Sequence, residues 1–156
     1  MPRYDPDDDV DLHGFSGSLA VYAVTTATFA GLTHLSGRTL PAAYPVRDLL
    51  VGGLAAHKFS RLLSRGAVTS PLRAPFTEFE GPAGASEHHE SARGEHGVRH
   101  TIGELLTCPF CMDVWIGTAY VGALQVAPRA ARTWAAVFAV TAVSDFLQHA
   151  YARLRG

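Results

Sequence analysis

The sequence predicts an all-α fold, a small polytopic membrane bundle of three to four hydrophobic helices. Hydrophobic residues make up 47% of the 156 residues and charged residues only 17%, against roughly 25% charged in soluble domains. The apolar residues are gathered in four segments separated by polar connections. The two cysteines are too few for a disulfide-rich secreted scaffold, and a net charge of −1 gives no support to nucleic-acid binding. A soluble four-helix domain is the architectural alternative.

The chain begins with an acidic segment followed by the first apolar one. Residues 1–14 are predicted to form a disordered tail, because their five Asp and two Pro leave little apolar surface to bury. The first helix is expected over 15–35, which carries no charged residue and has about the length that a bilayer core requires. Its many Ser, Thr, Gly and Ala residues suit close helix packing.

The second helix is expected over 46–64, where the uncharged core covers only 49–57. Such a core is short for a membrane span. It would cross as a short or tilted span if Arg47 and Lys58 extended to the two interfaces. Alternatively, the segment lies as an amphipathic helix on the membrane surface.

The third and fourth helices are expected over 109–127 and 133–151, followed by a basic C-terminal end at 152–156. Pro109 suits the first turn of a helix, where no backbone N–H is needed. Trp115 is then expected near a membrane interface. A stripe of small residues, which could join two copies of the chain, recurs every four positions: Ala119, Ala123 and Ala127.

The connection over 66–104 is polar and rich in Gly, His and Glu, and we expect a mobile loop with local turns. With four spans, this loop, the adjoining end of the second helix from Lys58 and both termini share one side and hold nine of the thirteen Lys and Arg residues. The excess of positive charge places the loop in the cytoplasm of a multi-pass protein of the cell membrane. Arginine outnumbers lysine twelve to one, a bias typical of GC-rich bacterial genomes.

Both cysteines belong to one motif, Cys108-Pro109-Phe110-Cys111, and three interpretations remain open. They are structural thiols, or a redox pair at a helix N-terminus whose dipole stabilises a thiolate, or zinc ligands. His96 and His100 precede them with the spacing of a ligand pair and would complete a Cys₂His₂ zinc site. Zinc is the only cofactor that the residues suggest.

One carboxylate, Asp113, interrupts the third apolar segment. A charge in such a segment is costly unless it is compensated. Asp113 would be favoured by the helix dipole in the first turn, or would pair with Arg61 or Arg65. Familiar catalytic motifs, such as G-x-S-x-G and the phosphate-binding loop, are absent from the sequence. We therefore expect a structural or interaction role in the lipid bilayer rather than an enzyme.

Two stretches, HKFSRLLSRGAVTSPLRAPFTEFEG and GELLTCPFCMDVWIGTAYV, resemble the bacterial family catalogued as domain of unknown function 1360. The resemblance covers roughly 46–151. It rests on the Arg-rich stretch at 58–63, a T-x-P-L-R-x-P-like segment at 69–75 and L-x-x-C-P-x-C-x-x-x-W at 105–115. It implies a small bacterial integral membrane protein of uncharacterised function. It also implies that five residues act together: Arg73, Cys108, Pro109, Cys111 and Trp115. The chain departs from the short family form by its first apolar segment and by Met112-Asp113.

Overall fold

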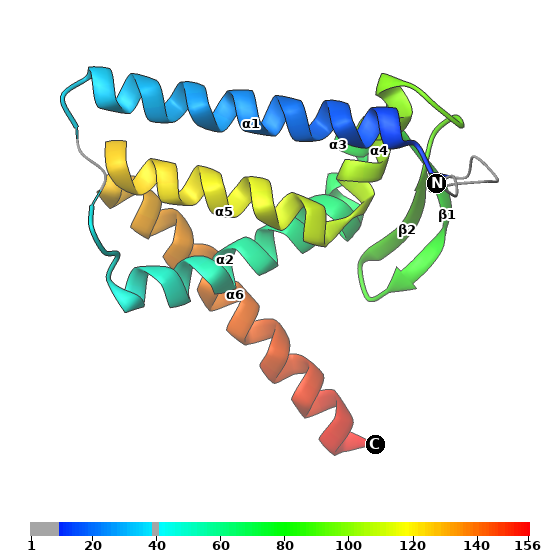
Figure 1. Cartoon of the computed structure of the whole chain (residues 1–156). Helices are drawn as coiled ribbons and strands as arrows, with labels where there is room; N and C mark the ends of the chain where they lie inside the picture. The colour runs from blue at the N-terminus through cyan, green and yellow to red at the C-terminus, as the bar shows by residue number, and fades with distance from the viewer. Residues whose placement is uncertain (1–9, 39–40) are drawn as a thin grey trace, which may run out of the picture.

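The computed structural model describes residues 10–38 and 41–156, and this part of the chain is mostly helical, as the sequence predicts (Figure 1). The elements, in chain order, are α1 (Leu12–Leu35), α2 (Val46–Arg65), the 3₁₀ turn η1 (Ala67–Thr69), α3 (Ser70–Arg73), β1 (Thr77–Gly84), β2 (Glu87–Ala92), α4 (Val98–Thr107), α5 (Pro109–Val126) and α6 (Pro128–Arg155). The helices expected over 15–35, 46–64, 109–127 and 133–151 correspond to α1, α2, α5 and α6. The first nine residues of the acidic tail lie outside the described part.

The all-α prediction needs a correction in the segment predicted to be a mobile loop, 66–104. This segment contains η1, α3 and the start of α4, together with a two-stranded antiparallel sheet. Strand β1 pairs with β2 from Thr77 opposite Ala92 to Gly84 opposite Glu87, with two irregularities in the register. Polar contacts to α2 and α3, described below, hold the hairpin in place. Because these contacts are polar, the hydrophobic periodicity of the sequence did not predict the hairpin.

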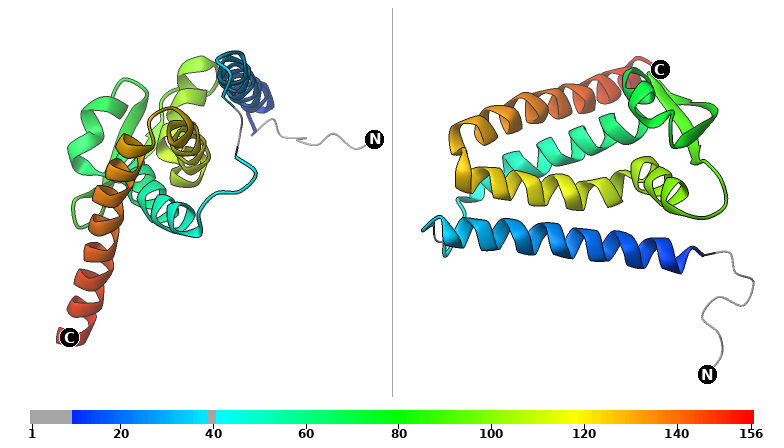
Figure 2. Two further views of the ribbon diagram at one scale, coloured as in Figure 1. Left: turned by 90° about the vertical axis from the view of Figure 1, so that its left-hand side faces the viewer. Right: turned by 90° about the horizontal axis from the view of Figure 1, so that it is seen from above.

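The four long helices run back and forth beside one another (Figure 1, Figure 2). The start of α1, the hairpin and the C-terminus lie toward one end of the bundle, while the α1–α2 and α5–α6 connections lie at the other. The four helices therefore alternate in direction along the bundle. The C-terminal part of α6 diverges from the other helices. The buried residues of α6 all lie in its first 15 residues: Ala131, Ala135, Ala139 and Ala142.

The core lies where α2 packs against both α5 and α6. Small residues bring the backbones together, because Ala55 of α2 and Ala135 of α6 are both fully buried. Tyr120 of α5 packs in the same cluster and donates a 3.0 Å hydrogen bond to the backbone oxygen of Asp48. The small-residue stripe that packs within the chain is thus on α6. The predicted stripe on α5 is exposed at Ala119 and Ala127.

Two ion pairs join α2 to α6. At the end of the bundle away from the hairpin, the guanidinium of Arg132 contacts both carboxylate oxygens of Asp48, with a closest N–O distance of 2.7 Å. Closer to the hairpin, the Lys58 ammonium binds the Asp145 carboxylate. Two of the charged residues that weaken the apolar character of α2, Asp48 and Lys58, therefore have partners on the neighbouring helix.

Two helices of the described chain, α1 and α6, are long and apolar enough to cross a membrane. The pair α4 and α5, bent by 85° at its break, makes a third if it counts as one span. The sequence predicted three to four spans, and the difference lies mainly in α2. This helix does not meet that standard of length and hydropathy, although it runs alongside the others (Figure 2).

Two adjacent glycines in α2 provide a test of the packing against α5. A Cβ added at Gly52 would overlap the ring of Tyr120, whereas one added at Gly53 would meet nothing within 4 Å. We expect Gly52→Ala to lower the free energy of unfolding by about 1–3 kcal/mol through overpacking. We expect Gly53→Ala to be neutral or to stabilise by up to about 1 kcal/mol, since alanine favours the helix. Unfolding of the full chain, followed by circular dichroism, measures both, and equal effects would contradict this packing.

Candidate functional site

Arg73 is the most completely enclosed charged side chain in the described structure, with only 1% of its side chain exposed. It lies at the end of the four-residue helix α3, directly after the turn that follows α2. Its guanidinium donates to the backbone oxygens of Leu63 and Gly66, at 2.7 and 3.1 Å, and to the hydroxyl of Thr69 at 2.7 Å. Arg73 therefore caps the C-terminal end of α2, where helical carbonyls lack partners.

The anionic partner of Arg73 is Glu90 of β2, whose side chain is 5% exposed. The two groups form a bidentate pair, with Nε to Oε2 at 2.9 Å and Nη2 to Oε1 at 2.6 Å. Hydroxyls of Thr77 and Ser70 also donate to the carboxylate, at 2.8 and 3.1 Å. Burial alone would raise the pKa of Glu90, but these hydrogen bonds and the Arg73 charge outweigh it, and the pKa lies below its ordinary value.

A second set of contacts lies nearer the surface and joins the Arg-rich end of α2 to β2. Arg61 binds both carboxylate oxygens of Glu87 at 2.7 Å. Arg65 contacts the Nδ1 atom of His89 at 3.0 Å. Ser70 of α3 contacts the Nδ1 atom of His88 at 2.9 Å. Polar contacts from α2 and α3 thus reach four consecutive residues of β2, and Glu90 is the most buried of them. This geometry accounts for the weight that the resemblance gave to Arg73.

The break between α4 and α5 follows from its sequence. Proline disfavours a helical conformation in the residue before it, and Cys108 is accordingly extended, with φ −102° and ψ 101°. Pro109 occupies the first turn of α5, as the sequence predicts. On the hairpin side, Gly103 of α4 lies against Phe76 and Ala92, where an added Cβ would come within 3.0 Å of the Ala92 Cβ. The hairpin therefore supports α4 directly, and α4 leads into the bend.

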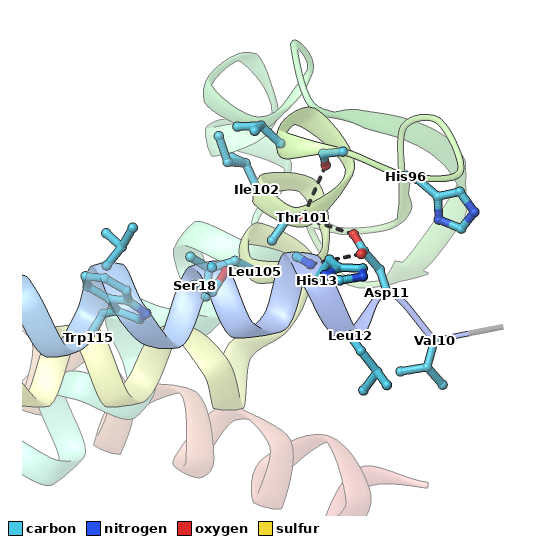
Figure 3. Close-up of a pocket in the computed structure, with 15 residues that line it drawn as sticks. Val10, Asp11, Leu12, His13, Ser18, His96, Thr101, Ile102, Leu105 and Trp115 are labelled. Atoms are coloured by element: carbon cyan, nitrogen blue, oxygen red, sulfur yellow. Dashed lines mark hydrogen bonds between the residues drawn. The ribbon is translucent and has the colours of Figure 1, made fainter. Parts of the chain in front are cut away.

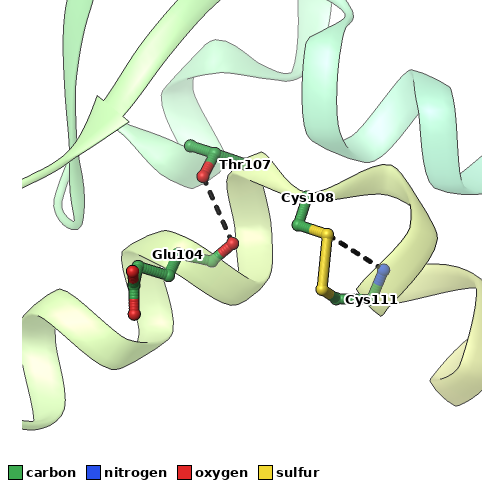
Figure 4. Close-up of a disulfide and its surroundings, with 4 residues drawn as sticks. All are labelled: Glu104, Thr107, Cys108 and Cys111. Atoms are coloured by element: carbon green, nitrogen blue, oxygen red, sulfur yellow. Dashed lines mark hydrogen bonds between the residues drawn. A yellow bond between two sulfur atoms is a disulfide. The ribbon is translucent and has the colours of Figure 1, made fainter. Parts of the chain in front are cut away.

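Cys108 and Cys111 form a disulfide at this bend (Figure 4). Cys108 Sγ also accepts a 3.2 Å hydrogen bond from the backbone N–H of Cys111, so Cys108 caps the N-terminus of α5. Cys111 is exposed, while Cys108 is half-buried. A disulfide at an exposed helix N-terminus is open to attack by an external thiolate.

Two cavities flank the N-terminal half of α1. The larger, about 890 Å³, lies between α1 and α4, and Asp11 at its rim accepts hydrogen bonds from Gly14 and Thr101 (Figure 3). The smaller, about 730 Å³, is lined by both cysteines and by residues of α1, α4 and α5. The cavities share four lining residues, and so form neighbouring parts of one hollow: Ser18, Thr101, Leu105 and Trp115.

The structure places the remaining predicted residues of α5 as follows. Trp115 lines both cavities and packs edge-on against Tyr22 of α1, with ring centres 5.1 Å apart. Asp113 lies just beyond the first turn of α5, and its buried Oδ1 has no hydrogen-bond partner in the described structure. The expected pairing of Asp113 with Arg61 or Arg65 is not formed, because these arginines bind Glu87 and His89 instead.

The predicted zinc ligands are not assembled into one site. Within the described residues, no group of three or more His, Cys, Asp or Glu side chains is arranged to hold a metal ion. Cys108 and Cys111 are bonded to each other, and a thiolate is the form that binds zinc. His100 lines the cavity beside the disulfide, whereas His96 precedes α4 and lines only the other cavity. Residues four apart share one face only within a helix. His96 lies before α4, which begins at Val98, so His96 and His100 do not share a face.

Sequence reasoning missed Glu90, Tyr22 and Glu104. Glu90 lies in a polar stretch that has no apolar alternation and gives no sign of burial. Glu104 lies four residues after His100, a spacing that places two residues on one helical face, and their side chains are 3.6 Å apart. The four-residue spacing of His100 and Glu104 could therefore have predicted this contact from the sequence.

The fold and site together define a class: a bundle of long helices capped at one end by an ion-paired β-hairpin, with a C-P-x-C disulfide at a helix bend. The chain belongs to the family described as protein of unknown function (DUF1360), which matches residues 51–151. The chain is also 31% identical over 98 residues to the sporulation protein YjcA of Bacillus subtilis (strain 168). That similarity covers 61% of this chain and 82% of YjcA. No solved structure matches the chain. Helix α1 precedes the matched residues.

The lowered pKa of Glu90 predicts that acid loosens the hairpin. The ionised carboxylate stabilises the fold fully above its ordinary pKa of 4.5, and this contribution is lost as the pH falls through the lower pKa of the folded state. Hydrogen exchange of residues 77–92, corrected for the intrinsic effect of pH, should therefore show protection that falls as the pH drops below about 5. Glu90→Gln should lower protection by about 3 kcal/mol at neutral pH and lose its share of the acid dependence.

The matched control is Glu95→Gln, which changes an exposed carboxylate in the turn before α4. It should leave both the protection and its acid dependence unchanged. An unaltered pH profile in Glu90→Gln would show that another group causes the acid loss.

Proposed function

We propose that this chain is a multi-pass bacterial membrane protein with a structural or interaction role. In this proposal the hairpin module, defined as residues 66–107, lies at the cytoplasmic face. The observation that carries the proposal is the exposure of α1. No residue is buried in the most apolar 18-residue stretch of α1. Several large side chains of this helix are more than half exposed: Leu19, Val21, Val24, Leu32 and Leu35. Such a continuous apolar surface is unusual on a soluble monomer, and a lipid bilayer would cover it.

The surface of α6 supports the same proposal. Exposed apolar side chains lie on the face away from the alanines that pack against α2, and they include Val137, Val140 and Leu147. The helix has 28 residues, which corresponds to about 42 Å at 1.5 Å per residue. This exceeds a hydrocarbon core of about 30 Å and would carry the basic C-terminal end beyond it.

We include α2 as a further crossing, although its charges keep it below the apolar standard. Its 20 residues would reach about 30 Å. Three of its polar residues face protein, because Asp48, Ser60 and Ser64 are buried. Asp48 binds Arg132 and Ser60 donates to the backbone oxygen of His57, whereas the Ser64 hydroxyl has no partner in the described structure. Polar groups are tolerated at membrane depth where they face the bundle interior and have partners. With α2 crossing, the excess of Lys and Arg at the hairpin end favours the cytoplasm.

The hairpin module would be the interaction part of the protein. Its buried Arg73–Glu90 pair gives it a defined shape, while Val68, Leu72 and Phe79 remain more than 60% exposed. In this proposal these exposed apolar side chains contribute to the surface that another molecule covers. The similarity to YjcA supports a bacterial setting for this role.

Labelling of single cysteines tests the crossing by α2. In a chain carrying Cys108→Ser and Cys111→Ser, Ala43→Cys marks the connection before α2 and Glu95→Cys marks the hairpin module. Both positions are exposed. A membrane-impermeant maleimide added to spheroplasts should label Ala43→Cys at once, and Glu95→Cys only after permeabilisation. The protein should also stay in the membrane pellet at alkaline pH. Equal labelling of both sites would contradict the crossing, and recovery in the supernatant would contradict membrane insertion.

A thiol–disulfide redox function is the second candidate, favoured by the bonded cysteines and the cavity that both of them line. Cytoplasmic disulfides in mesophiles are usually catalytic or redox-sensing rather than structural. A disulfide at the proposed cytoplasmic end would therefore be one that opens and closes. This candidate requires the pair to occur both as dithiol and as disulfide in cells, and a pair that is always reduced contradicts it.

A further inference from the structure

The cavity beside the disulfide, about 730 Å³, combines a redox group with aromatic and apolar walls. Cys108 and Cys111 lie on its α5 side. Phe15, Leu19 and Tyr22 of α1 line it from another helix, and Trp115 packs against Tyr22. Its lining thus suits a flat, mostly apolar molecule next to the sulfur atoms.

Two polar groups on α4 line the same cavity. His100 Nε2 lies 3.6 Å from Glu104 Oε1, while His100 Nδ1 and Glu104 Oε2 are buried without hydrogen-bond partners in the described structure. Buried polar atoms without partners are rare in folded proteins, because each one costs free energy. At the wall of the cavity, a protonated His100 can donate to a quinone oxygen, whereas an ionised Glu104 can only accept.

Access to this cavity is possible from the side of α1. Phe15 and Leu19 line it and are also 45% and 69% exposed. If α1 lies in a bilayer, as proposed above, these residues face the lipid phase. A lipid-soluble ligand could then reach the disulfide without passing through water.

We propose that this cavity binds a lipid-soluble quinone that oxidises the dithiol of Cys108 and Cys111. The inference rests on the redox candidate and deepens it by naming the electron acceptor. A dithiol and a quinone are matched, because each exchanges two electrons and two protons. The two S–H bonds break and one S–S bond forms, which releases two electrons and two protons. The quinone takes up both and leaves as hydroquinone.

The His100–Glu104 pair serves this reaction as a proton-transfer and positioning pair. Glu104 accepts the proton of one thiol as it becomes a thiolate, and His100 donates a proton to one quinone oxygen as the quinone is reduced. Glu104 then returns its proton to His100. The second thiol releases its proton to solvent, and the second quinone oxygen takes up a proton from solvent. The protons released by the thiols thus balance those that the quinone takes up.

The test uses the full chain, purified in a mild detergent, reduced, freed of reductant and kept without oxygen. The probe is a benzoquinone with a decyl tail, and its reduction is followed by absorbance. The wild type should reduce one quinone for every two thiols lost. Peptide mass spectrometry should find the Cys108–Cys111 disulfide and no thiol–quinone adduct. Cys108→Ser should abolish the reaction.

Two matched variants on α1 separate binding in the cavity from reaction in solution. Ser18 lines the cavity and is half-buried, whereas Ser16 is exposed on the same helix and does not line it. Ser18→Phe should slow quinone reduction by about tenfold at low quinone concentration, because it fills the site. Ser16→Phe should leave the rate within about twofold of wild type. Glu104→Gln should lower the rate and change its pH dependence, while leaving the affinity for quinone nearly unchanged.

Thiol labelling of acid-quenched cells separates failure of this proposal from failure of the redox candidate. Mass-tagged maleimide, applied with and without prior reduction, gives the fraction of the pair that is a disulfide. A pair that cycles in cells but reduces no quinone overturns the quinone site and leaves the redox candidate standing. A pair that is always reduced overturns both. Equal rates in wild type and Ser18→Phe, or adduct formation alone, also overturn the quinone site.

Discussion

The buried pair of Arg73 and Glu90 is the interaction on which the rest of this architecture depends. Arg73 is fixed by the last carbonyls of α2, and Glu90 belongs to the middle of β2. Their contact therefore fixes the hairpin against the end of the bundle. The hairpin in turn supports α4 through the close approach at Gly103, and α4 leads into the bend at Cys108. The Arg73–Glu90 ion pair thus connects α2, through the hairpin and α4, to the disulfide.

This dependence also explains why so polar a segment is ordered. A buried arginine or glutamate alone would be strongly unfavourable, and their mutual attraction compensates only if the remaining donors and acceptors have partners. Here Leu63, Gly66 and Thr69 accept from the guanidinium, and Thr77 and Ser70 donate to the carboxylate. Both charged groups therefore have hydrogen-bond partners besides each other. These contacts together specify one position for the hairpin.

The long helices could be predicted from the sequence because apolar segments of about twenty residues with few charges are typical of helices. The bend at Cys108-Pro109 was also foreseeable, since proline restricts the residue before it. The hairpin was not, because its strands carry Glu, His and Gly where an amphipathic strand would alternate polar with apolar residues. The importance of Arg73 came from the resemblance alone. Its partner Glu90, 17 residues away, could be found only from the structure.

A double-mutant cycle on this pair tests the central claim most directly. The full chain is compared with Arg73→Met, Glu90→Met and the double variant, with hydrogen-exchange protection of residues 77–92 as the measured free energy. Each single variant leaves one buried charge without its partner, and should lose about 3 kcal/mol of protection. The double variant should recover part of that loss, giving a coupling energy of at least about 2 kcal/mol. Additive losses, or an unchanged hairpin in either single variant, would contradict the account.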